Sequence, residues 1–201
     1  MRKIQSLFVI GLLGSVIGAG IAQAAPADLV KKCEGCHGAD GNGSDLNVPN
    51  IAGMSAVYIG DTLLAYKAGD RPGIKYKPKD GDESDMATVA KSLSEEDIKA
   101  VAAHFAGKTY QMHPQDVDAA LAAQGKQLFA DNCDRCHSDG GTIAEDDSSL
   151  LAGQGKPYLQ KQFENFTSGA RQMPKKMAKR FEKLDDAGKA AVIEYLAGGA
   201  K

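Results

Sequence analysis

The feature that most constrains this chain is a short motif that occurs twice, CEGCH at Cys33–His37 and CDRCH at Cys133–His137. The copies lie one hundred residues apart and use all four cysteines of the 201-residue sequence. In each copy a histidine directly follows a Cys-x-x-Cys pair. The fold must therefore present two thiols and one imidazole together at two separate places.

The two halves of the chain also match each other outside these motifs. Several identical pairs keep the spacing of one hundred residues: Gly41 and Gly141, Ala52-Gly53 and Ala152-Gly153, Tyr58 and Tyr158, Gly69 and Gly169, Arg71 and Arg171. The spacing then falls to 91, because Met86 and Leu93 match Met177 and Leu184. The chain is thus two copies of one unit. The first copy carries nine additional residues in a loop over 72–85 that is rich in Pro, Gly and charge.

Apolar residues follow a helical period in both copies. The spacing i, i+4, i+7 occurs at Ile59, Leu63 and Tyr66 and again at Leu159, Phe163 and Phe166. Ser94 and Asp97 form a capping-box signature at the start of a further helix. No segment alternates as a strand would, so the sequence predicts an all-α protein. We expect an N-terminal domain over 25–108, a linker over 109–117 and a C-terminal domain over 118–201.

The first 24 residues have the composition of an export signal. Arg2 and Lys3 precede a glycine-rich apolar stretch of about 16 residues that ends in the small-residue pattern Ala22-Gln23-Ala24. An uncleaved membrane anchor is the alternative, but a spanning helix needs roughly 20 residues. We therefore expect a signal peptide over 1–24, a mature chain in the periplasm and no membrane span after cleavage.

The charge of the chain is nearly balanced, with 24 basic and 26 acidic residues. No basic stripe indicates a nucleic-acid partner. Aromatic residues make up only 6% and tryptophan is absent. Two small domains of this composition have thin cores and gain stability from a group enclosed within them.

Four kinds of site use a Cys-x-x-Cys pair. A zinc site built from both pairs would need cysteines far closer together than Cys36 and Cys133, and a thioredoxin-like redox pair needs a βαβ context. A structural disulfide suits an exported protein but leaves the histidines unexplained. Covalent haem c explains every feature, because two thiols join the haem and the adjacent histidine binds its iron. The sequence therefore predicts two covalently bound haem c groups, attached through Cys33, Cys36, Cys133 and Cys136 and ligated by His37 and His137.

The sixth iron ligand of an electron-carrying haem is usually Met or His. Met86 and Met177 occupy equivalent places, after the long loop and before the last helix, and are the predicted ligands. Met173 is an alternative to Met177. Met54 and His104 are interpreted as packing residues and Met112 as a linker residue, and His113 has no counterpart in the second copy. With both axial positions filled, the iron transfers single electrons and holds no substrate.

Two further positions have supporting roles. The Pro49 carbonyl is placed to accept a hydrogen bond from His37 Nδ1 and so to orient the ring. Ser149 stands at the equivalent place, so we expect His137 to be held in another way. Arg71 and Arg171 are either partners of the haem propionates or solvated surface residues.

Together these motifs resemble the dihaem cytochromes of the cytochrome c4 type. The match rests on the doubled Cys-x-x-Cys-His, the Ala-Gly and Tyr that follow each, the Met-x6-Leu before each final helix, and SLSEEDIKAVAAHFAG at 92–107. It implies two tandem class I cytochrome c-like domains related by duplication, which carry electrons and catalyse no reaction.

The second half also resembles the dihaem subunit of flavocytochrome c sulfide dehydrogenase, at KTYQ (108–111), LAGQGKPYLQ (151–160) and MPKKMAKRF (173–181). That resemblance implies a partner subunit that carries FAD and oxidises sulfide, since this chain has no GxGxxG motif of its own. Our leading hypothesis is the cytochrome subunit or partner of such an enzyme. The alternative is a free-standing carrier that donates electrons to a soluble acceptor or a terminal oxidase. A dihaem peroxidase or thiosulfate dehydrogenase would need an open or unusually ligated iron.

Overall fold

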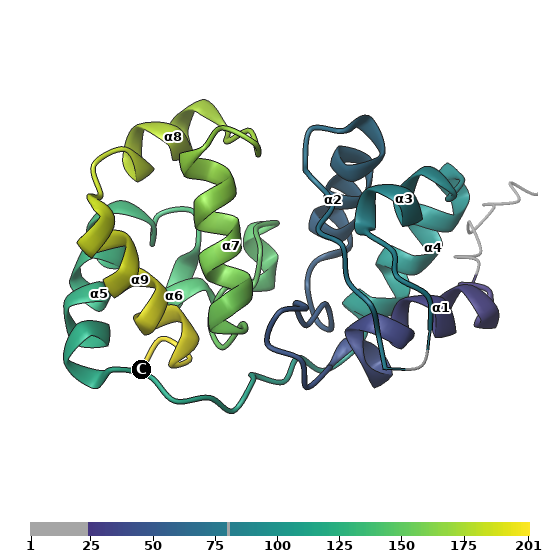
Figure 1. Ribbon diagram of the computed structural model, residues 1–201, viewed down its shortest axis with the longest axis horizontal. Helices are drawn as coiled ribbons and strands as arrows, with labels where there is room; N and C mark the ends of the chain where they lie inside the picture. The colour runs from purple at the N-terminus through teal and green to yellow at the C-terminus, as the bar shows by residue number, and fades with distance from the viewer. Residues whose placement is uncertain (1–23, 80) are drawn as a thin grey trace, which may run out of the picture.

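The computed structural model describes residues 24–79 and 81–201. The predicted signal peptide, residues 1–24, therefore lies outside the described residues except for Ala24. Figure 1 shows two helical units side by side, joined by an extended segment along one edge, with α2 of the first unit and α7 of the second facing each other across the middle. No described helix is both long enough and apolar enough to cross a membrane.

The first unit is built from α1 (Ala27–His37), a short 3-10 turn η1 (Ala39–Gly41), α2 (Ala56–Ala68), α3 (Met86–Lys91) and α4 (Glu95–Ala106). Helix α2 packs against α3 and α4, and α1 packs against α4. The predicted apolar face of α2 is buried in this core together with Ile98, Val101 and Phe105 of α4. The predicted capping box is present at the start of α4, where Ser94 and Asp97 exchange hydrogen bonds.

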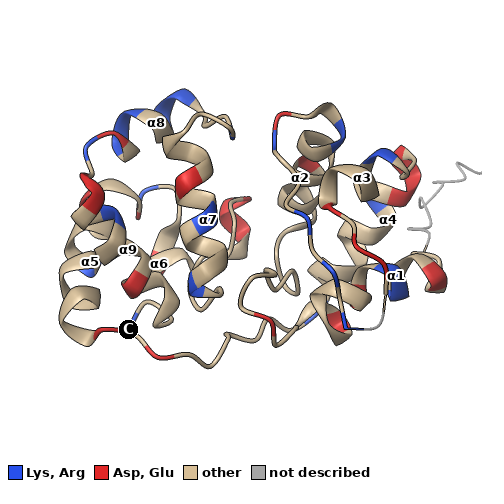
Figure 2. Ribbon diagram, viewed as in Figure 1, with Lys and Arg blue, Asp and Glu red and all other residues tan. Residues whose placement is uncertain are grey.

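The second unit contains α5 (Ala119–Asn132), α6 (Ser138–Gly141), a 3-10 turn η2 (Ala144–Asp146), α7 (Lys156–Thr167), α8 (Lys175–Phe181) and α9 (Asp186–Ala197). Helix α5 packs along α9, and α7 packs against α9 as well. Its core contains Phe129, Leu159, Val192 and Leu196. Helix α8, with the sequence KKMAKRF, is rich in basic residues, which are blue in Figure 2.

Matching backbone hydrogen bonds show the duplication directly. The Gly41 carbonyl accepts from the N–H groups of Ile51 and Ala52, at 2.9 and 3.2 Å. The Gly141 carbonyl accepts from the equivalent residues at 2.9 and 3.3 Å. Both glycines have a φ near 80°, a conformation that other residues rarely adopt. The repeated glycine in the sequence therefore marks a turn that both units need.

The all-α prediction is confirmed for the described residues, which contain no strand. A single antiparallel bridge joins Tyr76 to Ser84 inside the long loop of the first unit. The prediction for α7 is correct only in part. Leu159 is buried, but Phe163 and Phe166 are half-buried, and the polar residues Gln162 and Asn165 are buried instead. Gln162 is buried because it meets the first unit, where Arg71 donates a hydrogen bond to its side-chain oxygen.

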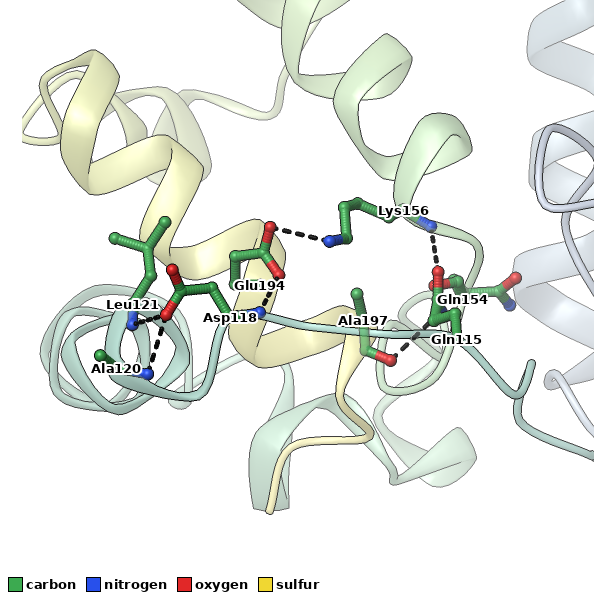
Figure 3. A network of polar contacts seen from close by, with 8 residues as sticks. All are labelled: Gln115, Asp118, Ala120, Leu121, Gln154, Lys156, Glu194 and Ala197. Atoms are coloured by element: carbon green, nitrogen blue, oxygen red, sulfur yellow. Dashed lines mark hydrogen bonds and ion pairs between the residues drawn. The ribbon is translucent and has the colours of Figure 1, made fainter.

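The segment between the two units is held by hydrogen bonds on both sides. Tyr110 donates its hydroxyl to the Ala152 carbonyl at 2.8 Å, and the His113 N–H donates to the Gly153 carbonyl at 2.8 Å. The Gln115 amide donates to the Gln154 and Ala197 carbonyls and accepts from the Lys156 N–H, as shown in Figure 3. The connection is therefore part of the packed structure.

Candidate functional site

The first motif lies in the last turn of α1, which carries Cys33, Cys36 and His37 on continuous helix. His37 is buried, and its Nδ1 lies 2.8 Å from the Pro49 carbonyl, as the sequence suggested. Burial lowers the pKa of His37, against a smaller opposite effect of that carbonyl. The ring is therefore neutral at pH 7, and its Nε2 is the nitrogen left for a metal.

None of the four cysteines forms a disulfide in the structure. Burial raises the pKa of Cys33 and of Cys133 to about 11, and burial also raises the pKa of Cys36. Redox-active thiols and zinc ligands work as thiolates and have a low pKa. The buried, neutral sulfur atoms of Cys33 and Cys133 are not of that kind.

A zinc site finds no support in the described part of the chain. No group of three or more His, Cys, Asp or Glu residues among residues 24–79 and 81–201 is placed to hold a metal ion. Each Cys-x-x-Cys-His set stands alone in its own unit. This arrangement suits a haem, whose own ring nitrogens supply four of the iron ligands.

The second motif has a different local structure. Helix α5 ends at Asn132, and Cys133 to His137 form a turn in which the His137 N–H donates to the Cys133 carbonyl at 3.1 Å. The His137 Nδ1 is buried and makes no well-formed hydrogen bond. Burial lowers the pKa of His137, and the nearby backbone of Ser149 partly opposes that change.

The sequence expectation for His137 is therefore correct only in part. The backbone of Ser149 lies beside the ring, as Pro49 does in the first unit, because a carbonyl group belongs to the backbone and not to proline. The contact nevertheless falls short of the hydrogen bond that His37 makes.

The two predicted axial methionines lie on helices that occupy equivalent places in the two units, Met86 on α3 and Met177 on α8. Met86 is the first residue of α3 and packs, half-buried, against the core cluster that Cys33 also contacts. Met177 lies in α8 and is also half-buried, as is Met173 in the preceding loop. Met54 is 3% exposed and belongs to the core, in agreement with its predicted packing role.

Sequence reasoning missed the contacts that join the two units. The Gln154 side chain is fully buried; it accepts from the Asn50 N–H at 3.0 Å and donates to the Asn50 carbonyl at 2.8 Å. The Asn50 amide in turn donates to the Gln111 carbonyl at 2.7 Å. Nothing in the sequence distinguishes these amides from ordinary surface residues, because Asn50 lies 61 positions from Gln111 and 104 from Gln154.

The donor sets of the two units fit haem c, and comparison with known proteins agrees. Cytochrome c4 from Pseudomonas aeruginosa is 31% identical to this chain over 97% of the chain and 96% of its own length. The chain belongs to the cytochrome c4 family. Cytochrome c4 from Azotobacter vinelandii is also 31% identical, over 82% of this chain and 81% of its own.

Solved structures and family models support this membership in the cytochrome c4 family. The crystal structure of reduced cytochrome c4 from Pseudomonas stutzeri covers 87% of this chain and 99% of its own, with 28% identity and a TM-score of 0.67. The family model for cytochrome c matches residues 22–109. The model for the cbb3-type cytochrome c oxidase subunit III matches residues 120–196.

Several sequence predictions are thereby confirmed. The chain consists of two tandem cytochrome c domains, it carries two covalently bound haem c groups, and it transfers electrons and is not an enzyme. The match to cytochrome c4 favours the alternative function, a free-standing electron carrier, over the leading hypothesis of a sulfide dehydrogenase subunit or partner. A link to flavocytochrome c sulfide dehydrogenase is not shown by these relatives.

Proposed function

We propose that this cytochrome c4 family member is a free-standing periplasmic carrier that passes single electrons to a terminal oxidase. In this proposal Cys33 and Cys36 attach the first haem, and Cys133 and Cys136 attach the second. His37 with Met86, and His137 with Met177, are the axial ligands. The domains are residues 25–108 and 118–201, linked by 109–117, after removal of a signal peptide over 1–24.

The observation that carries the proposal is the environment of His37. The Pro49 carbonyl fixes the ring, and burial keeps it neutral, so the imidazole is oriented to give Nε2 to iron. Haem c, when bound, supplies a reversible one-electron change at iron. A thioether as the sixth ligand raises the reduction potential, and a filled sixth position excludes substrates.

The surface of the second unit supports a docking role. Four exposed basic residues lie on α8, the helix that holds Met177: Lys175, Lys176, Lys179 and Arg180. A concentrated positive charge speeds the approach of an acidic partner and makes the rate depend on salt. The helix that carries the second predicted ligand is therefore also suited to meet an electron-transfer partner.

Two kinds of relative bear on the partner. A region of this chain is 37% identical over 108 residues to the cbb3-type cytochrome c oxidase subunit of Rhizobium etli, spanning 36% of that protein. Another is 36% identical over 77 residues to the thiosulfate dehydrogenase electron acceptor of Stutzerimonas stutzeri, spanning 32% of it. Both place this kind of domain in chains of electron transfer, and the first supports an oxidase as acceptor.

The test uses protein matured and purified from periplasm. Haem is counted per chain, carbon monoxide is added to the ferrous form, and bound flavin is sought in the absorption spectrum. We expect two haems, no reaction with carbon monoxide, no flavin, and rapid oxidation by membranes that contain a terminal oxidase. Added salt should slow that oxidation.

Other outcomes would overturn the proposal. If flavin co-purified and anaerobic sulfide reduced the haem promptly, the protein would be the cytochrome subunit of a sulfide dehydrogenase. Carbon monoxide binding at neutral pH would indicate an open iron and an enzyme. If the rate of haem oxidation depended neither on the membranes nor on the salt concentration, a terminal oxidase would not be the acceptor.

A further inference from the structure

His113 is a buried histidine that the two haem sites do not use. It lies in the segment between the units and is 4% exposed. Its backbone N–H donates to the Gly153 carbonyl at 2.8 Å, which fixes the position of the residue. Both ring nitrogens are buried, and neither has a hydrogen-bond partner among the described residues. A neutral imidazole has one donor and one acceptor nitrogen, and each costs free energy when it is buried without a partner.

The ring of His113 faces an acidic side chain of the first unit. Asp45 is half-buried, and its charge acts on His113 from the loop that follows the first Cys-x-x-Cys-His motif. The Asp45 carboxylate is held in place by hydrogen bonds from the backbone and the amide of Asn47, both at 2.9 Å, and from the Tyr76 hydroxyl at 2.9 Å. The ion pairs between described side chains do not include Asp45. A protonated His113 would therefore have a fixed anionic neighbour that no described cation already pairs.

The pKa of His113 reflects these surroundings. Burial lowers the pKa below its ordinary value, because a positive charge is poorly solvated at this place. The Val48 carbonyl and the Asp45 carboxylate oppose part of this effect, since both favour the charged ring. The ring is therefore neutral at pH 7, and it takes up a proton below about pH 6.5.

The backbone connects this place to the ligand of the first haem. The Val48 N–H donates to the Asp45 carbonyl at 3.0 Å, so residues 45–48 form a closed turn. Val48 precedes Pro49, whose carbonyl lies 2.8 Å from His37 Nδ1. The ring of His113 thus lies beside the segment that orients the first axial histidine.

The long loop of the first unit makes a second connection. Tyr76, which donates to Asp45, has its pKa raised by burial and by that carboxylate, and the sulfur of Cys36 adds to the rise. Tyr76 therefore lies close to Cys36, a thiol that attaches the first haem in our proposal. Two separate segments thus place Asp45 and His113 near the first haem and not near the second.

We propose that His113 and Asp45 form a proton-binding site coupled to the first haem. The inference rests on the haem assignment of the proposed function and not on the identity of the electron acceptor. His113 takes up one proton from the solvent when the first unit gains one electron, and it releases that proton when the electron leaves. The added positive charge offsets the added negative charge, so the two events favour each other. The coupling is reciprocal: reduction raises the proton affinity of His113, and the proton raises the reduction potential.

The coupling predicts the direction of a pH effect. The potential of the first haem should rise as pH falls below about 6.5 and should be level near pH 7 and above. A proton affinity about threefold higher in the reduced form would appear as a rise of about 28 mV, because a tenfold change in a one-electron equilibrium corresponds to about 59 mV.

The test measures both midpoint potentials of the fully matured protein by spectroelectrochemical titration from about pH 5 to 8. We expect one potential of the wild type to rise in acid and this rise to be lost in His113→Gln. His104→Gln is the matched control, because it removes a half-buried imidazole from α4 of the same unit and should keep the rise. Asp45→Asn should move the rise to lower pH, because the protonated ring then lacks its anionic neighbour.

A second measurement uses the wild-type protein. Histidine labelled with ¹³C at Cε1 is followed by NMR as the pH changes, in fully reduced and in fully oxidised protein. The signal that His113→Gln lacks should titrate at higher pH in the reduced form. An acid rise that persists unchanged in His113→Gln, or a His113 signal that titrates at the same pH in both forms, would overturn the proposal.

Failure of the haem assignment would look different. A haem count below two per chain, or carbon monoxide binding by the ferrous wild type, would refute the assignment and this inference with it. Two haems with closed irons and potentials that do not change with pH would refute the coupling at His113 alone.

Discussion

Replacement of Gln154 by leucine should weaken the contact between the two units. Leucine fills a similar volume but makes no hydrogen bonds, so the N–H and carbonyl of Asn50 lose the partners that lie at 3.0 and 2.8 Å. Both groups belong to a residue that is 2% exposed. A buried polar group left without a partner costs about 1–3 kcal/mol, which gives a total of roughly 2–6 kcal/mol.

The assay is urea and thermal unfolding of the haem-loaded protein, followed by circular dichroism and by haem absorption. For a chain of this size, a loss of about 3 kcal/mol lowers the midpoint of thermal unfolding by roughly 6–12 °C. Gln172→Leu is the matched control, because Gln172 is exposed and makes one weak contact, to the Gly169 carbonyl at 3.3 Å. Equal midpoints for the two variants would show that water replaces the lost bonds and would refute the reasoning.

Two further predictions concern an iron ligand and acid stability. Met177→Ala should open the second iron to carbon monoxide and lower its potential, whereas Met173→Ala should do neither; the reverse result would make Met173 the ligand. Hydrogen bonds from the backbone and hydroxyl of Ser94 lower the pKa of Asp97. The folded protein therefore favours the carboxylate of Asp97. This carboxylate stabilises α4 above the unfolded pKa of about 4, and the stabilisation is lost as pH falls through the lowered pKa of the folded state. Urea midpoints at neutral and acid pH should converge for wild type and Asp97→Asn as the pH falls; a constant difference would contradict this account.

Local patterns in the sequence were sufficient to predict the helices and the donor atoms. The spacing of Ile59, Leu63 and Tyr66 depends only on helical geometry, and the capping box of Ser94 and Asp97 depends on neighbours in the chain. The Cys-x-x-Cys-His motif is equally local. The contact of His37 with Pro49 spans twelve residues and followed from chemistry, because a ligating histidine usually has a partner for its second nitrogen.

The boundary between the units could not be predicted in the same way. Gln162 and Asn165 have the character of solvent-facing residues on an amphipathic helix, yet both are buried. Arg71 and Gln162 are 91 positions apart, and Asn50 and Gln154 are 104 apart, so their meeting depends on how two whole domains pack. The periodicity of a sequence identifies which side of a helix is apolar. It does not reveal that the polar side is buried against polar groups of another domain.

The polar character of this boundary bears on the origin of the doubled chain. Amide and guanidinium side chains such as those of Gln154, Gln162 and Arg71 are as well suited to water as to a protein contact. A single unit could carry these polar side chains on its surface in contact with water. The boundary also has an apolar part, because Leu150 of the second unit is buried in the core cluster of the first. Polar side chains that tolerate water could thus precede a stable contact between the two copies, which the burial of Leu150 would then strengthen.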